Sequence, residues 1–251
     1  MVDHDVFLPE NVCRHTLDWR DIGEHKVDAL DCQLSYIAPN IRVEVSRLHL
    51  AGQESAAAVN GILNRLSKCD LLIDATASPL VFNLLATVAD KSQKPLVWME
   101  VYAGGIGGMV ARSRPGIDPT PHTIRNAYFE ALPDTAVPDL PRTAEAYSAE
   151  TRGGGVVAAT DADVSIVAGF AAKFVLDTLA ATELSLFPYS IYLIGLAQSW
   201  LFEAPFHTIP IATAHLHDGP KADASQPEAL SEALQFLADI LTHSNDADSS
   251  S

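Results

Sequence analysis

The strongest constraint on the fold is a strand–helix–strand pattern in the first half of the chain. Residues 69–76, CDLLIDAT, form a short apolar run that ends on an acid and predicts a buried strand. Residues 80–89 have the apolar spacing of a helix, and residues 95–103 form a second strand-like run. Strands that alternate with helices at this interval predict crossovers and a mostly parallel sheet flanked by helices, a Rossmann-like α/β class. Ligands bind at the carboxyl ends of such strands, which is where Asp74 falls.

Further segments extend this pattern along the chain. The glycines at 104–108 predict a turn, because a phosphate-binding loop has to open a helix and residues 109–116 instead predict a short strand. Residues 133–141 predict an exposed crossover loop. Helical spacing covers residues 29–37, 56–66, 122–132, 161–181 and 231–241, and residues 41–50 alternate as a strand does.

Length and charge limit the function classes. A chain of 251 residues predicts one domain, taken as residues 1–242, with a polar, disordered tail at 243–251. A net charge of −16, from 32 acidic and 16 basic residues, argues against a nucleic-acid partner. The acidic start is no signal peptide, and the apolar residues 189–202 are too few to cross a bilayer, so we expect a cytoplasmic protein with no membrane contact. Three widely spaced cysteines fit a reducing compartment and offer no zinc site.

The first candidate site is a set of polar side chains near the start of the chain. Asp3 supplies a carboxylate that suits a ribose hydroxyl, and Asp5 follows it closely. Asn11, Arg14 and Lys26 supply an amide and two cations, which suit a phosphate chain. The alternative is that the two cations are ordinary solvated charges and Asp5 a turn or capping residue.

The order of these residues resembles the ThiF/MoeB-type adenylyltransferases, the ubiquitin-activating-enzyme-like family. The resemblance implies ATP and Mg²⁺, with Asp3 on the ribose, Asn11 on a phosphate oxygen, and Arg14 and Lys26 as the catalytic cations on the phosphates. It assigns Asp74 to the nucleotide and to Mg²⁺. The matching elements are Asp3-His4-Asp5, Asn11-Val12-Cys13-Arg14 and Gly23-Glu24-His25-Lys26.

The chain departs from the family pattern at two places. The family has Asp-x-Thr-Asp-Asn and then an arginine, whereas Asp74-Ala75-Thr76 continues here with Ala77 and Ser78, and Phe82 stands at the arginine position. The glycine-rich nucleotide loop of the family precedes the Asp-x-Asp element, where this sequence begins. We therefore expect a family member that is incomplete at its N-terminus, one to which another polypeptide supplies that unit, or one that binds no nucleotide.

The resemblance implies activation of the C-terminal carboxylate of a ubiquitin-like or sulfur-carrier protein, by a homodimer or heterodimer. Residues 133–141 contain no cysteine for a thioester, which leaves adenylation alone or transfer to a partner's cysteine. The first alternative is a non-catalytic partner subunit that binds a modifier protein or an active homologue, and a dehydrogenase fragment is less favoured. His215 and His217 form an alternating pair beside Asp218, but no third clustered ligand accompanies them as a metal ion requires.

Overall fold

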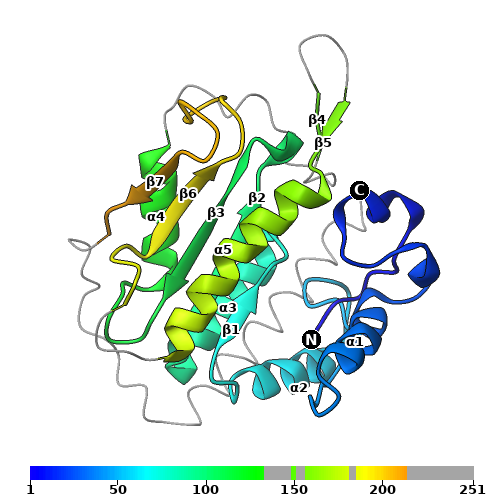
Figure 1. The fold of residues 1–251 in the computed structure, drawn as a ribbon. Coiled ribbons are helices and arrows are strands. Elements are labelled where there is room, and N and C mark those ends of the chain that lie inside the picture. Colours follow the sequence, from blue (N-terminus) through cyan, green and yellow to red (C-terminus); the bar gives the residue numbers. More distant parts are fainter. Residues whose placement is uncertain (133–147, 151–155, 181–184, 214–251) are drawn as a thin grey trace, which may run out of the picture. The chain divides into compact units, whose positions relative to one another are not determined.

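The computed structural model describes residues 1–132, 148–150, 156–180 and 185–213. They fall into two compact units, of which the first takes in Met1–Asn64 and the second begins at Arg65. In Figure 1 the first unit runs from blue to cyan, and the described part of the second continues through green to orange.

Short helices build the first unit. Pro9 occupies the first position of the first 3₁₀ helix, where a missing N–H costs no hydrogen bond. The first α-helix ends at Ile37, because Pro39 disfavours helical backbone at Ala38. The elements are η1 (Pro9–Arg14), η2 (Trp19–Asp21), α1 (Lys26–Ile37) and α2 (Ala56–Leu66), the last with the bounds that the sequence predicted.

A small apolar cluster ties the start of the chain to α1. Phe7, Leu17 and Ala29 are all buried and pack together. The backbone N–H of Phe7 donates to the carbonyl of Glu24 (2.8 Å), and the N–H of Lys26 donates to the carbonyl of Asp5 (2.9 Å). These bonds hold residue 5 beside the first turn of α1.

The strand predicted at residues 41–50 is reduced to one bridge. Ser46 pairs in parallel with Val2, through the Asp3 N–H to the Ser46 carbonyl (3.0 Å) and the Ser46 N–H to the Met1 carbonyl (2.9 Å). An alternating pattern yields a strand only where a partner continues the ladder. The described part of the first unit offers a partner at this single register.

The second unit contains a five-stranded mixed sheet with the order β1-β2-β3-β6-β7. Only β1 and β2 pair in parallel, and the other three neighbouring pairs are antiparallel, so the prediction of a mostly parallel sheet is wrong. The reason is the glycine turn: Gly104 and Gly105 have φ of 72° and 69°, which lets the chain reverse directly between β2 and β3. The strands are β1 (Leu72–Asp74), β2 (Leu96–Val101), β3 (Gly107–Ser113), β6 (Ile191–Gly195) and β7 (Thr208–Ile211), and β4 (Ser148–Glu150) pairs separately with β5 (Val156–Ala158).

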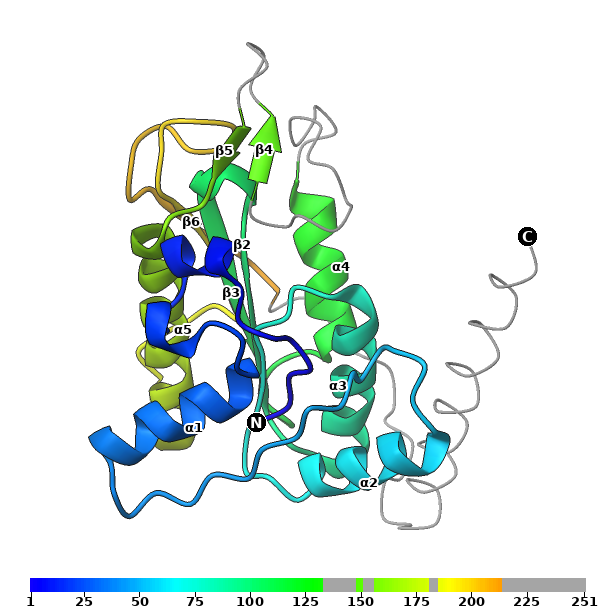
Figure 2. The same cartoon turned by 90° about the vertical axis from the view of Figure 1, so that its right-hand side faces the viewer.

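Helices cover both faces of this sheet, as Figures 1 and 2 show. The helix α5 (Asp161–Ala180) lies on one face against β2 and β3, and α3 (Pro79–Ser92) and α4 (Pro121–Ala131) lie on the other. Along β2 the side chains alternate between these faces: Val97 packs with α5, and Trp98 contacts Phe82 of α3. Polar side chains on the α3/α4 face therefore belong to a different layer from the α5 core.

Several predictions lie outside the described residues: the loop at 133–141, the histidine pair at 215–217, the helix at 231–241 and the tail at 243–251. Among the residues that are described, no helix combines the length and the apolar character needed to cross a membrane.

Candidate functional site

Lys26, predicted to contact phosphates, forms an ion pair with Asp5. Its Nζ lies 2.6 Å from Asp5 Oδ2, and its side chain is only 16% exposed. Burial alone would raise the pKa of the Asp5 carboxyl, but the hydrogen bond and the charge of Lys26 outweigh burial and lower it. The ammonium group is thus held in place, and an anion at this point would share it with Asp5.

Asp3 and His4 lie directly beside this pair. The Asp3 carboxylate accepts the backbone N–H of Asp5 at 2.9 Å. His4 stacks on His49 with 3.8 Å between ring centroids. One ligand atom from each of Asp3, His4 and Asp5 lies within 4.8 Å of the others, close enough to share a metal ion. His4 has no predicted role, although its place between Asp3 and Asp5 is the signal for one.

Asn11 and Arg14 lie three residues apart on η1. In a 3₁₀ helix this spacing places two side chains on the same side. The Asn11 carboxamide oxygen accepts the N–H of Leu8 at 2.9 Å, and Arg14 Nη1 donates to the carbonyl of Glu10 at 3.0 Å. The amide and the cation predicted to meet phosphates thus share one side of a short helix, and both are half-buried.

Asp74 belongs to the second unit, at the end of β1. It is 3% exposed, and its Oδ1 accepts both the backbone N–H of Thr76 (2.9 Å) and the Thr76 hydroxyl (2.7 Å). Burial raises the pKa of Asp74, against the opposing effects of the Thr76 hydrogen bonds and the Arg125 charge. Ser78, and not Asp74, caps α3 by accepting the N–H of Val81.

The turn after Asp74 contains a residue with left-handed backbone. Ala77, at the position of the second aspartate in the family pattern, has φ of +53°. Left-handed backbone favours glycine, asparagine and aspartate, so alanine here pays a conformational cost. Ala77 provides no side-chain oxygen, which leaves Asp74 as the carboxylate of this turn that could hold a cation.

A cleft of about 360 Å³ extends from Asp74 along the α3/α4 face of the sheet. Glu100 of β2 lines it from the sheet, and Arg125 and Tyr128 line it from α4. Burial raises the pKa of Glu100, and the nearby Arg125 charge opposes that rise. Burial lowers the pKa of Arg125, with Glu100 and Asp74 opposing. Two carboxylates and one guanidinium thus share a poorly hydrated space.

Arg125 is held in this cleft by aromatic rings. Its guanidinium carbon lies 4.4 Å from the centroid of the Phe82 ring and 5.6 Å from that of Phe129. Within the described residues it forms no hydrogen bond and no ion pair. Neither Glu100 nor Arg125 was predicted as a site residue, because an acid inside an apolar strand and a cation on a helix give no periodic signal of proximity.

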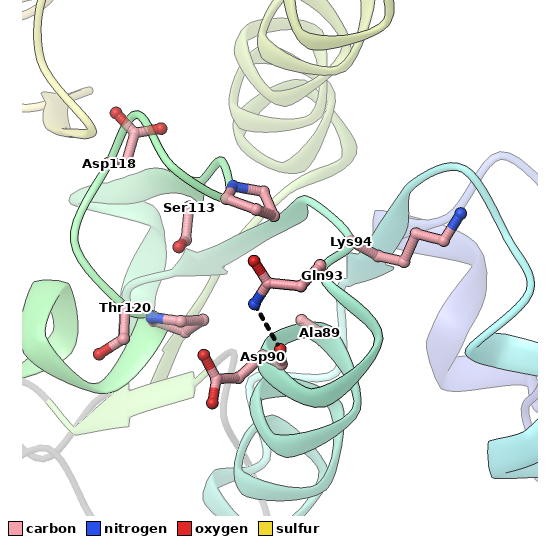
Figure 3. A pocket seen from close by; sticks show the side chains of 9 residues that line it. Ala89, Asp90, Gln93, Lys94, Ser113, Asp118 and Thr120 are labelled. Atoms are coloured by element: carbon pink, nitrogen blue, oxygen red, sulfur yellow. Dashed lines mark hydrogen bonds between the residues drawn. The ribbon is translucent and has the colours of Figure 1, made fainter. Parts of the chain in front are cut away.

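A second pocket, of about 270 Å³, lies near the C-terminal end of α3 and is drawn in Figure 3. Its polar groups are largely satisfied within the chain. Gln93 Nε2 donates to the carbonyl of Asp90 at 2.8 Å, and Asp118 accepts from Arg114 at 2.7 Å. Lys94 extends away from Asp90 in the figure. The Asp74 cleft is therefore the stronger candidate site of the second unit.

This chain matches a known protein family. The model of the ThiF family matches residues 1–192. No curated protein matches this chain at a significant level.

Solved structures are similar at low sequence identity. PaaA matches with a TM-score of 0.58 and 16% identity, over 84% of this chain and 63% of that one. MccB of E. coli, solved with ATP, matches with a TM-score of 0.58 and 13% identity, over 86% of this chain and 56% of that one. MccB in complex with N-formylated MccA also has a TM-score of 0.58, at 14% identity, over 86% of this chain and 58% of that one. At such identities the likeness shows the α/β fold alone, and the chain spans only part of the length of these proteins.

Proposed function

Because the chain belongs to the ThiF family, we propose that it binds ATP and activates the C-terminal carboxylate of a ubiquitin-like or sulfur-carrier protein. In this reaction a carboxylate oxygen forms a bond to the α-phosphorus of ATP. The bond between that phosphorus and the bridging oxygen breaks, and pyrophosphate leaves. The product is an acyl adenylate that a thiol or an amine can consume.

The observation that carries this proposal is the arrangement of cations and amide in the first unit. Asn11 and Arg14 share one side of η1, and Lys26 is held at the start of α1 by Asp5. We assign Arg14 and Lys26 to the phosphates, Asn11 to a phosphate oxygen and Asp3 to the ribose. Such groups act by holding the reactants in line and by neutralising charge that develops on the leaving pyrophosphate.

Asp74 is proposed to hold Mg²⁺. Magnesium in nucleotide sites commonly takes one or two carboxylates together with phosphate oxygens and water. Thr76 engages Oδ1 of Asp74, while Oδ2 accepts no hydrogen bond within the described residues. A single carboxylate fits a magnesium ion that completes its shell from phosphate and water.

The solved relatives support the choice of substrates. MccB of E. coli has been solved with ATP and, separately, with MccA. A nucleotide and a polypeptide substrate are accordingly the classes to test first for this chain, in a homodimer or in a heterodimer with a family member.

A non-catalytic role is the second candidate, and Ala77 and Phe82 favour it. Each stands where the family pattern has a polar residue, an aspartate and an arginine respectively. A chain that has lost these groups can keep the fold and bind a modifier protein or an active homologue.

The test is calorimetric titration of the full chain with ATP and Mg²⁺. We expect binding by the parent chain, loss of binding in Arg14→Ala, and unchanged binding in Arg42→Ala, which removes the same charge from an exposed position of the same unit. If the parent chain does not bind, the catalytic proposal is wrong for this polypeptide acting alone, and the partner role is favoured.

A further inference from the structure

The Asp74 cleft contains hydrogen-bonding groups that the chain itself leaves unmatched. Asp74 lies opposite Trp98 in the β1/β2 pairing, and Glu100 follows two residues beyond Trp98 on the same face of the sheet. The Glu100 carboxylate accepts no hydrogen bond from any described residue. This partly buried side chain is therefore an acceptor without a donor in the described part of the chain.

Donors without acceptors face the same cleft. The guanidinium of Arg125 has five N–H groups; it lies over the Phe82 ring and finds no hydrogen-bond acceptor among the described residues. Trp98 is 4% exposed, and its indole Nε1 also lacks an acceptor there. The buried Trp98 N–H costs free energy until an acceptor arrives, and the partly buried Arg125 and Glu100 add donors and an acceptor beside it, so a ligand that provides both an anion and a donor is favoured.

Charge decides which ligand fits. With both acids ionised, Asp74, Glu100 and Arg125 give the cleft a net charge of −1, which disfavours a simple anion. A simple cation would satisfy Glu100 but would leave Arg125 and Trp98 unmatched. A zwitterion whose two charged groups lie close together satisfies both sides of the cleft.

The remaining lining is mostly apolar, with Ser78 and Tyr128 as its polar members. Phe82, Met109 and Phe129 contribute aromatic and thioether surface. The cleft of about 360 Å³ is open, and this volume includes solvent space at its mouth. The ligand is thus a small molecule with one apolar substituent.

We propose that this cleft binds a free α-amino acid with an apolar side chain, its carboxylate on Arg125 and its ammonium group on Glu100. The apolar side chain lies against Phe82, Met109 and Phe129. Asp74 adds negative potential on the ammonium side. This binding requires neither ATP nor a carrier protein, so it stands or falls separately from the adenylation proposal.

The first test uses the unaltered chain and three probes, without ATP. L-Leucine, N-acetyl-L-leucine (no ammonium group) and L-leucinamide (no carboxylate) are titrated, and the indole N–H signal of Trp98 is followed by NMR. The chain has three tryptophans, so Trp98→Phe assigns the signal. We expect leucine to shift the Trp98 signal, and to bind with a dissociation constant lower by about tenfold or more than either analogue, because each analogue lacks one charged hydrogen-bonding group.

Other outcomes overturn the proposal in identifiable ways. Equal binding of N-acetyl-leucine indicates a peptide C-terminus as the ligand, and equal binding of leucinamide indicates an amine. If none of the three shifts the Trp98 signal, the cleft is no amino-acid site.

Variants then test the two assigned residues. Glu100→Gln and Arg125→Gln each weaken leucine binding by about tenfold or more, because a charged partner is lost. The matched controls are Glu130→Gln and Lys173→Gln, which remove the same charges from exposed positions of the second unit and leave leucine binding unchanged. Leucine binding that survives both Glu100→Gln and Arg125→Gln contradicts the assignment.

Discussion

The guanidinium of Arg125 lies 4.4 Å from the centroid of the Phe82 ring, and Phe82 occupies the position of an arginine in the family pattern. Arg125 of α4 therefore contacts Phe82, the residue of α3 at which the family pattern predicts an arginine. The Asp74 cleft thus contains a positive group from α4, although residues 75–82 supply none.

We predict that Phe82 and Arg125 stabilise the fold jointly. In a double-mutant cycle with Phe82→Leu and Arg125→Met, the free energies of unfolding should show a favourable coupling of about 0.5–1 kcal/mol, the usual strength of a cation–π contact. Urea denaturation of the four proteins measures it. The control cycle pairs Phe82→Leu with Lys173→Met on α5, where additivity within about 0.5 kcal/mol is expected. Additivity in the Arg125 cycle would show that the contact contributes nothing.

The left-handed backbone at Ala77 leads to a prediction about stability. With φ of +53°, alanine pays about 1–2 kcal/mol for left-handed backbone. Glycine avoids that cost but gains freedom in the unfolded state, so Ala77→Gly should raise the free energy of unfolding by roughly 0.5–1 kcal/mol. The control is Ala75→Gly, an exposed neighbour outside the positive-φ region, which should lower it.

Aspartate at the same position should restore a cation ligand. Ala77→Asp tolerates the left-handed conformation and places a second carboxylate in the turn of Asp74. We expect it to strengthen Mg²⁺-dependent ATP binding by about tenfold, as measured by calorimetry with and without Mg²⁺. Ala77→Asn, which keeps the shape without the charge, should give a smaller gain. An equal gain from both would argue against a metal ligand.

The sequence predicted the helices better than it predicted the sheet and the cleft. The bounds of α2 match the prediction, and α5 begins at the predicted residue, Asp161, because long apolar periodicity is a local property. The glycines at 104–108 predicted the turn, but the direction of the strands was inferred from the helix–strand alternation, which does not indicate that β3 returns antiparallel to β2. Glu100 lies in an apolar strand and meets α4 only in the folded chain.

The buried pair of Arg112 and Asp177 predicts an acid-sensitive step. The pair joins β3 to α5, and the two side chains are 0% and 3% exposed. Burial alone would raise the pKa of Asp177, but hydrogen bonds from Arg112, Ser185 and the Leu186 N–H outweigh it and lower this pKa to about 2. The folded state therefore binds fewer protons than the unfolded state between the ordinary value of 3.8 and about 2, so stability falls as the pH drops through that window.

Replacing one or both residues of the Arg112–Asp177 pair separates the cost of an unpaired buried charge from the contribution of the pair itself. Asp177→Ala leaves a buried guanidinium without its counter-ion and should cost about 3–5 kcal/mol. The double replacement Arg112→Met/Asp177→Leu should come close to the parent stability, and its stability should depend less steeply on pH between about 4 and 2. Chemical denaturation across that pH range checks both statements. An unchanged pH profile in the double variant would remove Asp177 from the explanation.

Two paired glycines make room for Phe202. Gly107 of β3 lies opposite Gly195 of β6, and a Cβ added to Gly195 would lie 2.4 Å from Cγ of Phe202, a ring that is 3% exposed. Gly195→Ala therefore forces the ring or the sheet to shift, and should lower the free energy of unfolding by about 1–3 kcal/mol. Gly169→Ala is the matched control: nothing lies within 4 Å of its added Cβ, and inside α5 alanine should stabilise the chain by roughly 0.5–1 kcal/mol. In a Phe202→Ala background Cγ and Cδ1, the two nearest of the clashing atoms, are absent, so the cost of Gly195→Ala should shrink; if that cost persists there, the clash with the Phe202 ring is not its cause.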